Sequence, residues 1–542
     1  MEIASLPPLA AQLLHNRGIT DPTEAEAFLR GDERLQGDPF LLPDMEKAVA
    51  RIYQALLGGE LIAIYGDFDA DGICGIAVLT RGLSLLGGNT TCYIPHRIEE
   101  GYGLNSASLE SLRKQGVTLV ITVDCGISNL TEVDSARKSG LDIIITDHHV
   151  TPPALPPALA VVDPKREDSL YPFSQLAGVG VAFKLLQGLF QSLGKELPLE
   201  ELLDVVALGT VADMVPLLGE NRYLVKRGLK TLSRTRRLGL QELVNFAGLS
   251  LANLNAEDIS WVLVPRLNAP GRLDHALPSY RLLVTDSSEE AHHLALELAQ
   301  KNTRRQRLTE EFLGRAKEQL SGSDSPLLIA GGEDFPQGIT GLIAGRLTGE
   351  FYRPSIVFEL GQSTSTGSAR SIAEFDIAAA LEECRDLLIK YGGHAMAAGF
   401  TLPTENLAQF QERLLHLAAG QLSGIELYPF LTIDAKVPLS SINGDIFKLI
   451  ERFAPFGQSN PLPTFLSPGV RVMDSYPVGN HSQHLKMKLR EGDIIWPGIG
   501  FNLGHLAGEV TPEIDLVYNL TVDRWNGADT LGLNIHDFAS IP

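Results

Sequence analysis

Four short apolar segments in the first 165 residues of the chain each end on an aspartate. They are LIAIYGD to Asp67, TLVITVD to Asp124, DIIITD to Asp147 and ALAVVD to Asp163, and TTCYIP (90–95) is a fifth apolar segment. Their apolar residues run continuously, as in strands of a parallel sheet that is buried on both faces. Ligands bind outside the carboxyl ends of such strands. We therefore expect an α/β domain in which four acidic side chains meet at one edge of the sheet.

Acidic side chains gathered in this way would repel one another unless a cation lay between them. Because carboxylates outnumber imidazoles, hard ions (Mn²⁺ or Mg²⁺) fit better than zinc. The acids exceed what one ion needs, which predicts two ions bridged by Asp124. Asp67 is expected close by, and Asp147 is expected to orient a metal-bound histidine. The candidate ligands are Asp69 and Asp71 in GDFDADG, Asp124, His148 in TDHH, and Asp213 in GTVADMVPL.

Simpler explanations exist for some of these residues. An aspartate at the end of a strand often forms a turn, and Asp163, which precedes Pro164, fits that role. Asp213 equally fits a helix cap. A calcium-binding EF-hand loop that begins at Asp67 is excluded, because its twelfth position is Val78 instead of a glutamate.

The pattern of elements predicts several domains. Strands alternate with helices from 51 to 165, which is βαβ patterning, and helices dominate from 177 to 250 with an interruption at 209–217. A helix over 288–320, almost free of Gly and Pro, would span roughly 50 Å and bridge two domains. The predicted division is a helical leader (1–50), an α/β domain with the acids (51–285), the connecting helix (286–325), a second α/β domain (326–424) and a β domain (425–542).

The β domain is predicted from strict alternation near the end of the chain. Apolar residues alternate with polar ones on both sides of an expected hairpin turn at Asn526-Gly527, which is typical of half-buried strands. A small barrel is expected. The alternating residues are Ile514, Leu516, Tyr518, Leu520 and Val522, then Leu531, Leu533 and Ile535.

Charge argues at first against a polyanionic partner, because the formal net charge of the 542-residue chain is −21. Two basic clusters are exceptions, with six Lys/Arg in 226–237 and four in 301–307. They fit either solvated helix faces or a phosphate-binding channel. No signal peptide or membrane span is predicted. The cysteines have no C-x-x-C pairing, so reduced thiols in a cytoplasmic protein are expected: Cys74, Cys92, Cys125 and Cys384.

Several motifs resemble the DHH phosphoesterase superfamily in their order along the chain: GDFDADG (66–72), VDCGI (123–127), TDHH (146–149) and GTVADMVPL (209–217). TDHH holds the triplet Asp147-His148-His149 that gives the superfamily its name. Further motifs are similar to its branch of single-strand-specific DNA exonucleases. They are RLNAPGRL (266–273), NTRRQR (302–307), GSARS (367–371), GGHAMAAGF (392–400) and RFAPFGQSNPLPTF (452–465). The resemblance extends from about residue 10 to the end of the chain.

The resemblance implies two divalent ions on the five candidate ligands, with His149 and Arg272 acting on the scissile phosphate. It implies that GSARS and the Gly-Gly-His segment belong to a DHH-associated domain that closes over the nucleotide. The terminal β domain is implied to be an OB-fold that guides single-stranded DNA. The residues implied to bind phosphate groups or the nucleotide are Arg97, Arg305, Gln306, Ser368, Arg370 and His394.

The implied activity is 5′→3′ hydrolysis of single-stranded DNA to mononucleotides, in DNA repair and recombination. Single-strand-binding protein and a helicase are candidate partners besides the DNA, and a monomer without membrane contact is expected. The chain is expected to lack the extra C-terminal partner-binding domain of some members. Two alternatives stay open: a phosphodiesterase of the same superfamily for short oligonucleotides or cyclic dinucleotides, and a non-catalytic DNA-binding scaffold. The β domain, the bridging helix and the basic clusters favour a long strand over the first alternative.

Overall fold

The five apolar segments form one parallel sheet in the computed structural model, which describes residues 6–523 and 530–541. Its strand order is β2-β1-β3-β4-β5, and all neighbouring strands are parallel. Ile62 and Ile64 face one buried side of the sheet, and Ala63 and Tyr65 face the other. The predicted strands are thereby confirmed as β1 (Leu61–Gly66), β2 (Asn89–Tyr93), β3 (Val117–Val123), β4 (Asp142–Thr146) and β5 (Ala160–Val162).

Helices cover both faces of this sheet and so exclude water from the strands. Helices that pack on one face share a core with Ile62 and Ile64, and helices on the other face share a core with Ala63 and Tyr65. The first group is α3 (Met45–Gly58), α4 (Ala70–Leu85) and α7 (Gly178–Ser192), and the second is α5 (Ser106–Lys114) and α6 (Leu130–Lys138). With both faces covered, the carboxyl edge of the sheet is where a ligand can reach the strand ends.

The run of helices after the sheet differs from the prediction in one place. An interruption is expected at 209–217, but α8 (Leu203–Ala212) continues to Ala212, and the break begins at Asp213. Gly209 suits the helix interior because a Cβ there would lie 2.8 Å from Val179 Cγ1 and 3.0 Å from Asp71 Oδ1. Close packing therefore overrides the low helix propensity of this glycine. The remaining helices are α9 (Gly219–Leu232), α10 (Leu238–Phe246), α11 (Ala256–Asp258), α12 (Val264–Leu273) and α13 (Leu277–Val284).

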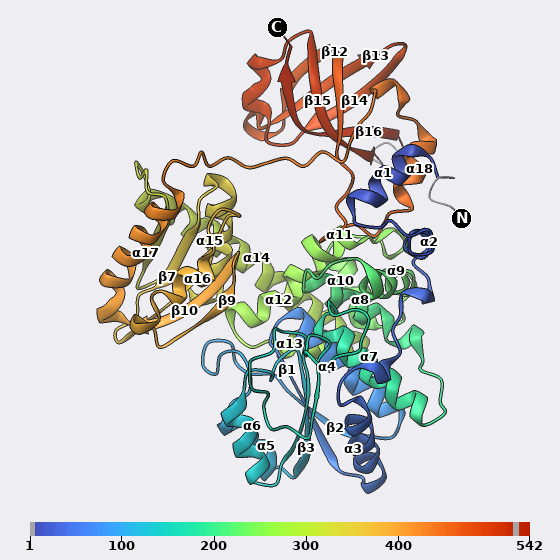
Figure 1. Ribbon diagram of the computed structural model, residues 1–542, viewed down its shortest axis with the longest axis vertical. Helices are drawn as coiled ribbons and strands as arrows, with labels where there is room; N and C mark the ends of the chain where they lie inside the picture. Colours follow the sequence, from blue (N-terminus) through green and yellow to red (C-terminus); the bar gives the residue numbers. More distant parts are fainter. Residues whose placement is uncertain (1–5, 524–529, 542) are drawn as a thin grey trace.

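The predicted long bridging helix is confirmed as α14 (Ser288–Gln319). Ser287 caps its start by accepting a hydrogen bond from the N–H of Glu290. Its first half shares the core of the first α/β domain, and its second half shares a core with β6 (Leu328–Gly332) and α15 (Gln337–Phe351). Figure 1 shows α14 between the two α/β domains.

The second α/β domain contains a mixed sheet of order β6-β7-β8-β10-β9. β6 and β7 are parallel, and the other pairs are antiparallel. α15 covers one face, and α16 (Ile377–Glu382) and α17 (Leu407–Leu422) cover the other. The further strands are β7 (Ser355–Glu359), β8 (Thr364–Arg370), β9 (Lys390–His394) and β10 (Ala397–Pro403).

The C-terminal strands form the predicted barrel, closed because β12 pairs with both β13 and β15. The strand order is β11-β12-β13-β14-β16-β15. The alternating residues from Ile514 to Leu520 are buried in its core, whereas the expected turn at Asn526-Gly527 lies outside the described residues. The elements are β11 (Ala435–Lys436), α18 (Gly444–Glu451), β12 (Phe465–Val478), β13 (His484–Glu491), β14 (Ile494–Gly500), β15 (Glu513–Asp523) and β16 (Thr530–Ser540).

The N-terminal helices α1 (Pro8–Asn16) and α2 (Pro22–Arg30) pack against the segment that enters the barrel. Leu13, Leu14 and Phe28 share a core with Phe453. Arg17 donates to the side chain of Asn460 and forms an ion pair with Asp434. The three domains and this contact enclose a central opening, crossed at its upper edge by the extended linker 423–434 (Figure 1).

The domain limits stay predictions, and the limit at residue 50 lies inside α3.

Several cations of the basic cluster 226–237 form contacts within the protein, a role that neither sequence interpretation includes. Lys226 donates to the carbonyl of Leu29, and Arg234 donates to that of Lys230. Arg237 pairs with the buried Asp204 and donates to the carbonyl of Leu283. Several of these cations therefore stabilise protein contacts, which a count of charges along the sequence does not reveal.

Two buried cations connect parts of the chain that are far apart in sequence. Arg222, on α9, is fully buried and donates to the carbonyls of Phe28, Arg452, Phe453 and Ala454. Burial lowers its pKa to about 9. Lys184, on α7, is equally buried and pairs with Glu220 at 3.0 Å.

Within the described residues, no helix is long and apolar enough to span a membrane, and all four cysteines are free.

Candidate metal centre and nucleotide-binding site

Acidic residues from three strand ends lie together at the carboxyl edge of the first sheet, as predicted. Asp67 follows β1, Asp124 follows β3, and Asp147 follows β4, and all three are at most 5% exposed. Asp213 approaches from the C-terminal end of α8. It therefore does occupy a helix cap, and it also belongs to the acidic group.

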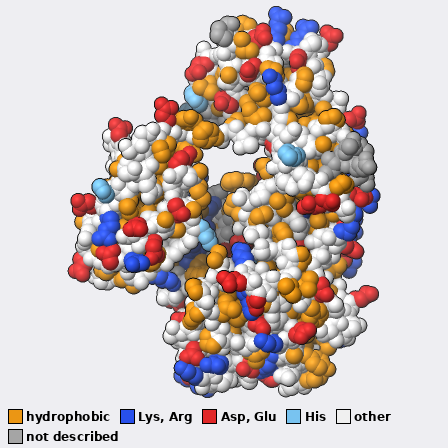
Figure 2. Space-filling model, viewed as in Figure 1, with side chains coloured by type: hydrophobic (Ala, Val, Ile, Leu, Met, Phe, Trp, Pro, Cys, Tyr) orange, Lys and Arg blue, Asp and Glu red, His pale blue; other side chains and the backbone are white. Residues whose placement is uncertain are grey.

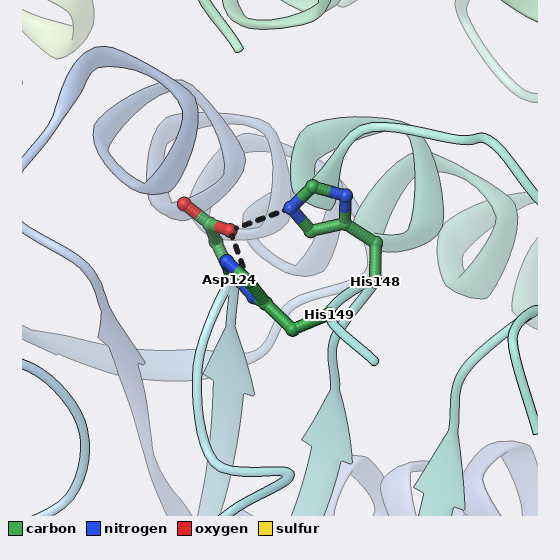
Figure 3. A group of neighbouring side chains, drawn as sticks. All are labelled: Asp124, His148 and His149. Atoms are coloured by element: carbon green, nitrogen blue, oxygen red, sulfur yellow. Dashed lines mark hydrogen bonds and ion pairs between the residues drawn. The ribbon is translucent and has the colours of Figure 1, made fainter. Parts of the chain in front are cut away.

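The two histidines that follow β4 both turn toward Asp124 (Figure 3). Nε2 of His148 lies 3.0 Å from Oδ1 of Asp124, and Nδ1 of the same ring lies 3.5 Å from Oδ2 of Asp213. Nδ1 of His149 lies 3.8 Å from Asp124 and 2.7 Å from Oδ1 of Asp147. Asp124 has a φ of 60°, a left-handed conformation that is unusual for an aspartate. The backbone is thus strained where these side chains converge.

Helix N-termini hold the last two acids of the GDFDADG motif. Asp69 caps α4 by accepting from the N–H groups of Asp71 and Gly72. Both oxygens of Asp71 accept from the start of α7, at 2.6 Å from the N–H of Gly178 and 2.9 Å from that of Val179. A Cβ at Gly178 would lie 2.6 Å from the Cβ of Asp124. This glycine therefore allows α7 to approach the acids.

Crowding of carboxyl groups shifts their protonation toward the neutral form. Burial, with repulsion from Asp69, raises the pKa of Asp67 to about 8 and that of Asp213 to about 7. Burial and neighbouring acids raise the pKa values of Asp71 and Asp124 well above the usual range. A divalent cation would reverse these shifts, because the ionised carboxylate is the form that binds metal.

The pKa values of the two histidines are shifted in opposite directions. Burial and the neighbouring His149 lower the pKa of His148 to about 3, so its ring is neutral, as a metal ligand must be. Burial opposes the charged form of His149, but the hydrogen bond to Asp147 prevails and raises its pKa. Asp147 also accepts from the N–H groups of Ile127 and both histidines, which fixes it as a support for the site.

The donor atoms fit two divalent ions. Three groups of side chains place one ligand atom each within 4.8 Å of one another, and His148 and Asp124 each belong to two of the groups. Three buried atoms in these groups have no hydrogen-bond partner: Oδ1 of Asp67, Nδ1 of His148 and Oδ2 of Asp213. The groups are Asp67-Asp69-Asp124, Asp71-His148-Asp213 and Asp124-His148-His149. Asp67 is thus placed among the possible ligands, although a supporting position is expected for it from the sequence.

Four arginines from four elements lie near these acids. Arg272 ends α12, Arg305 lies on α14, Arg370 ends β8, and Arg97 is stacked on Phe68 with its guanidinium 4.6 Å from the ring centre. Burial, with repulsion from Arg97 and Arg305, lowers the pKa of Arg272 to about 9. Burial and Arg97 likewise lower the pKa of Arg370. Arg97, Arg305 and Arg370 all repel the charge of Arg272, so the four residues form one cationic surface. Figure 2 shows Lys and Arg side chains in the hollow between the two α/β domains.

The other predicted nucleotide-binding residues are not all part of this surface. Oγ of Ser368 lies 3.0 Å from Oγ1 of Thr340, beside Arg370 on β8. Gln306 and His394 are exposed, on α14 and at the end of β9, and the side chain of neither forms a hydrogen bond with another described residue. Asp163 is fully buried, and it accepts from the N–H of Lys165 while its Oδ2 has no partner.

Three further residues support the site without having been predicted from the sequence. The hydroxyl of Tyr102 donates to the carbonyl of Asp124 at 3.2 Å and lies 3.1 Å from Nδ1 of His149. Asn268, on α12, accepts from the N–H of Ala70 at 2.8 Å and so links α12 to the start of α4. Gly338, on α15, lies against Arg272, whose carbonyl would be 1.8 Å from a Cβ at that position. Tyr102 lies in the GYG that follows Arg97 and Asn268 lies within RLNAPGRL, but neither segment marks these residues as supports, and Gly338 lies in none of the motifs.

Models of known families match three parts of this chain. They are the DHH family, N-terminal domain, over residues 61–210, the DHHA1 domain over 324–420 and the RecJ OB domain over 433–537. These matches fall on the parallel sheet with its acids, on the mixed sheet with Arg370 and on the closed barrel. Each of the three sheets therefore has a counterpart in a known family.

Individual proteins are similar over nearly the whole chain. The single-stranded-DNA-specific exonuclease RecJ of Bacillus subtilis (strain 168) is 39% identical over 98% of this chain and 68% of its own length. The crystal structure of RecJ with Mn²⁺ from Thermus thermophilus has a TM-score of 0.86 at 30% identity, covering 100% of this chain and 77% of that one. The Mg²⁺ complex of the same protein has a TM-score of 0.79 at 29% identity, covering 100% and 76%. Together with the metal-ligating groups at the sheet edge, these similarities show that the chain belongs to the RecJ family of DHH phosphoesterases.

Proposed function

We propose that this protein is a 5′→3′ exonuclease that hydrolyses single-stranded DNA to mononucleotides, in DNA repair and recombination. The observation that carries the proposal is the group of acids and histidines at the sheet edge, which faces a surface of four arginines. Phosphodiester hydrolysis needs both of these groups. The metal centre activates the attacking water, and the cations stabilise the charge of the phosphate.

The cofactors are two divalent ions, Mn²⁺ or Mg²⁺. They would be held by Asp69, Asp71, Asp124, His148 and Asp213, and the unpartnered Oδ1 of Asp67 supports this residue as a sixth ligand. Bound ions of this kind lower the pKa of water and stabilise the charge on the phosphate oxygens. Asp124 is proposed as the shared ligand, since it belongs to two of the three groups.

The remaining site residues are proposed to bind the scissile phosphate. Asp147 holds Nδ1 of His149 and raises the pKa of that ring, so Nε2–H is available to donate to a phosphate oxygen. Arg272 is positioned beside Asp69 by its place at the end of α12 and carries a charge without a salt-bridge partner among the described residues. A phosphate between His149 and Arg272 would therefore meet hydrogen-bond donors on both sides.

The polarity is proposed to come from the 5′-terminal phosphate. Ser368 and Arg370 belong to the second α/β domain, and Arg97 of the first α/β domain lies close enough to Arg370 to lower the pKa of its guanidinium group. Charge-assisted hydrogen bonds to a phosphate are among the strong polar contacts. Arg305 is proposed to hold a further phosphate of the strand, whereas for Gln306 and His394 the support is the family motif alone.

The two alternatives are disfavoured by specific features. A non-catalytic scaffold does not need buried, unpartnered ligand atoms, which raise the energy of the metal-free fold. A phosphodiesterase for cyclic dinucleotides or short oligonucleotides does not need a third domain beside the opening. We further propose that the protein acts as a monomer in the cytoplasm and that single-strand-binding protein or a helicase delivers the strand.

The test uses oligonucleotides labelled at either end. With Mn²⁺ or Mg²⁺, single-stranded DNA labelled at the 5′ end should release labelled mononucleotide at once, while the 3′ label should appear in a ladder that shortens progressively. Blunt duplex DNA and samples with chelator serve as controls and should stay intact. Release of the 3′ label first, or hydrolysis of dinucleotides alone, would contradict the proposal.

A further inference from the structure

Trp261 is exposed to an unusual degree for its residue type. Its side chain is 76% exposed, whereas the other tryptophan in the described residues, Trp496, is 6% exposed. Tryptophan is highly buried on average and is enriched at interfaces, where its large apolar ring is covered by a partner. The ring makes no aromatic or cation–π contact within the described part of the chain. The indole is therefore available to a ligand.

The backbone segment that carries this ring is anchored in the core. Residues Ile259–Leu263 form a π-helical segment between α11 and α12, closed by the N–H of Val264 on the carbonyl of Ile259. Ile259 and Leu263, on either side of the tryptophan, are fully buried and anchor the segment. Such π turns are rare and recur at functional sites. With the backbone anchored, only the two side-chain torsions of the tryptophan have to be ordered when a ligand covers the ring.

Two arginines provide cations without a salt-bridge partner: Arg266, five residues after Trp261, and Arg305 on α14. Arg266 donates to the carbonyl of Val262, while its Nε is buried with no hydrogen-bond partner. Nε of Arg305, on α14, is likewise buried with no hydrogen-bond partner. Burial lowers the pKa of Arg305, and both Arg346 and Arg266 contribute. No described acid forms a salt bridge with Arg266 or Arg305, so these two guanidinium groups fit anions that come from outside the protein.

The tryptophan lies on a path that leads away from the metal centre. Arg272 ends α12, and Trp261 precedes this helix, so the two are roughly 16 Å apart along its axis. Figure 1 places α11, which comes directly before the π segment, beside the central opening. Figure 2 shows that the opening passes through the molecule and that hydrophobic side chains lie along its lower rim. A strand cleaved at the metal centre and continuing into the opening would pass this region.

We propose that Trp261 is a stacking platform for a base of the single strand, several nucleotides from the one being cleaved, while Arg266 holds a neighbouring phosphate. The inference rests on the proposed exonuclease function. An aromatic face beside unpaired cations matches the alternation of base and phosphate along a single strand. Stacking does not select among bases, because every base has a π-face. A paired base in a duplex offers no free face, so the contact also favours single strands.

The test compares Trp261→Ala, Trp261→Phe and the control Tyr53→Ala, which removes a 43% exposed aromatic ring from α3. Binding of a 20-nucleotide strand to the full chain is measured in chelator by fluorescence anisotropy. One stacked base contributes ~1–3 kcal/mol, so Trp261→Ala should weaken binding about 5- to 150-fold. Trp261→Phe and Tyr53→Ala should stay within about threefold of the wild type. Trp261→Phe should also abolish most of the quenching of tryptophan fluorescence by the strand.

A scan with single abasic nucleotides locates the contact. One position should weaken binding to the wild type and have no effect on Trp261→Ala, while dinucleotide hydrolysis is equal in both proteins. If Trp261→Ala binds the long strand like the wild type and no abasic position separates the two, the stacking proposal is overturned and the exonuclease proposal stands. If the wild type hydrolyses no strand at all, the exonuclease proposal fails, and the binding measurements still decide whether the indole stacks on a base.

Discussion

Asp124 combines two properties that a substitution can separate: it is the proposed shared metal ligand, and its backbone has a φ of 60°. Asp124→Ala and Asp124→Gly should both lower nuclease activity at least ~10²-fold, because one lost ligand affects both ions. The glycine variant should be the more stable by about 1 kcal/mol, since only glycine adopts this conformation without strain. Activity assays and thermal unfolding check the two parts. Near-wild-type turnover by either folded variant would contradict the two-ion site.

Tyr102 tests whether the orientation of His149 matters. Tyr102→Phe removes a hydroxyl that contacts both the Asp124 carbonyl and His149. The loss of one such hydrogen bond costs ~1 kcal/mol, so kcat should fall about fivefold with little change in KM. Steady-state kinetics on a short strand measures both constants, and Tyr53→Phe on α3 is the control. A change confined to KM would assign Tyr102 to strand binding instead of positioning.

Asp163 should make stability depend on pH. Burial raises its pKa from 3.8 to about 7, so the folded protein holds a proton that the unfolded chain has released. Its stabilising contribution is complete below pH 3.8 and is lost as the pH rises to about 7. Asp163→Asn cannot ionise, so its stability relative to the wild type should increase over this range, by up to a few kcal/mol, and then level off. Denaturant unfolding in chelator measures the difference. A difference that stays constant over this pH range would show that burial does not raise the pKa of Asp163.

The sequence predicts the residues of the metal centre better than their supports. The strand-end acids and TDHH are recognisable because a parallel sheet places the ends of its strands side by side. Asp213 has an ambiguous signal, since one aspartate after a helix is explained equally by a cap. Tyr102, Asn268 and Gly338 are brought to the site by tertiary packing alone, and no local pattern identifies them.

At the scale of elements, α15 is pressed against the end of α12 so closely that Gly338 is required. A Cβ at Gly338 would lie 1.8 Å from the carbonyl oxygen of Arg272. Gly338→Ala should displace the second α/β domain and lower activity on single-stranded DNA by at least tenfold, while each domain stays folded. Gly349→Ala on the same helix is the matched control, because a Cβ there meets nothing within 4 Å. Equal activity of the two variants would show that the contact between Gly338 and Arg272 does not determine the geometry of the site.

The elements themselves are largely predictable from local pattern. Continuous apolar runs identify β1, β3, β4 and β5, and the long polar stretch without Gly or Pro identifies α14. The extension of α8 through Gly209 is not predictable, because it depends on tight packing against α4 and α7. The contacts of the 226–237 cluster are not predictable from local pattern either. Lys226 and Arg237 bind a carbonyl and a carboxylate group that are distant in sequence.

At the scale of the whole molecule, Arg222 joins the leader, the first α/β domain and the entry to the barrel. Arg222→Met should leave buried carbonyl groups without a donor, at a cost of ~1–3 kcal/mol each. We expect the barrel to detach, so that activity on 20-nucleotide strands falls while dinucleotide hydrolysis is kept. Small-angle scattering and the two assays check this. Lys226→Met, which frees the single carbonyl of Leu29, is the control. An unchanged radius of gyration with unchanged activity on long strands would exclude this role.

The contact between Arg17 and Asn460 joins residues 443 positions apart. A ribosome adds about 5–20 residues per second, so the leader leaves the ribosome roughly 20–90 s before its partner is made. During that time the apolar side chains of Leu13 and Leu14, buried in the finished protein, remain in water or on a chaperone. The opening beside the metal centre can close only after the barrel has been synthesised. A newly made chain therefore completes this opening after the first sheet has had time to fold.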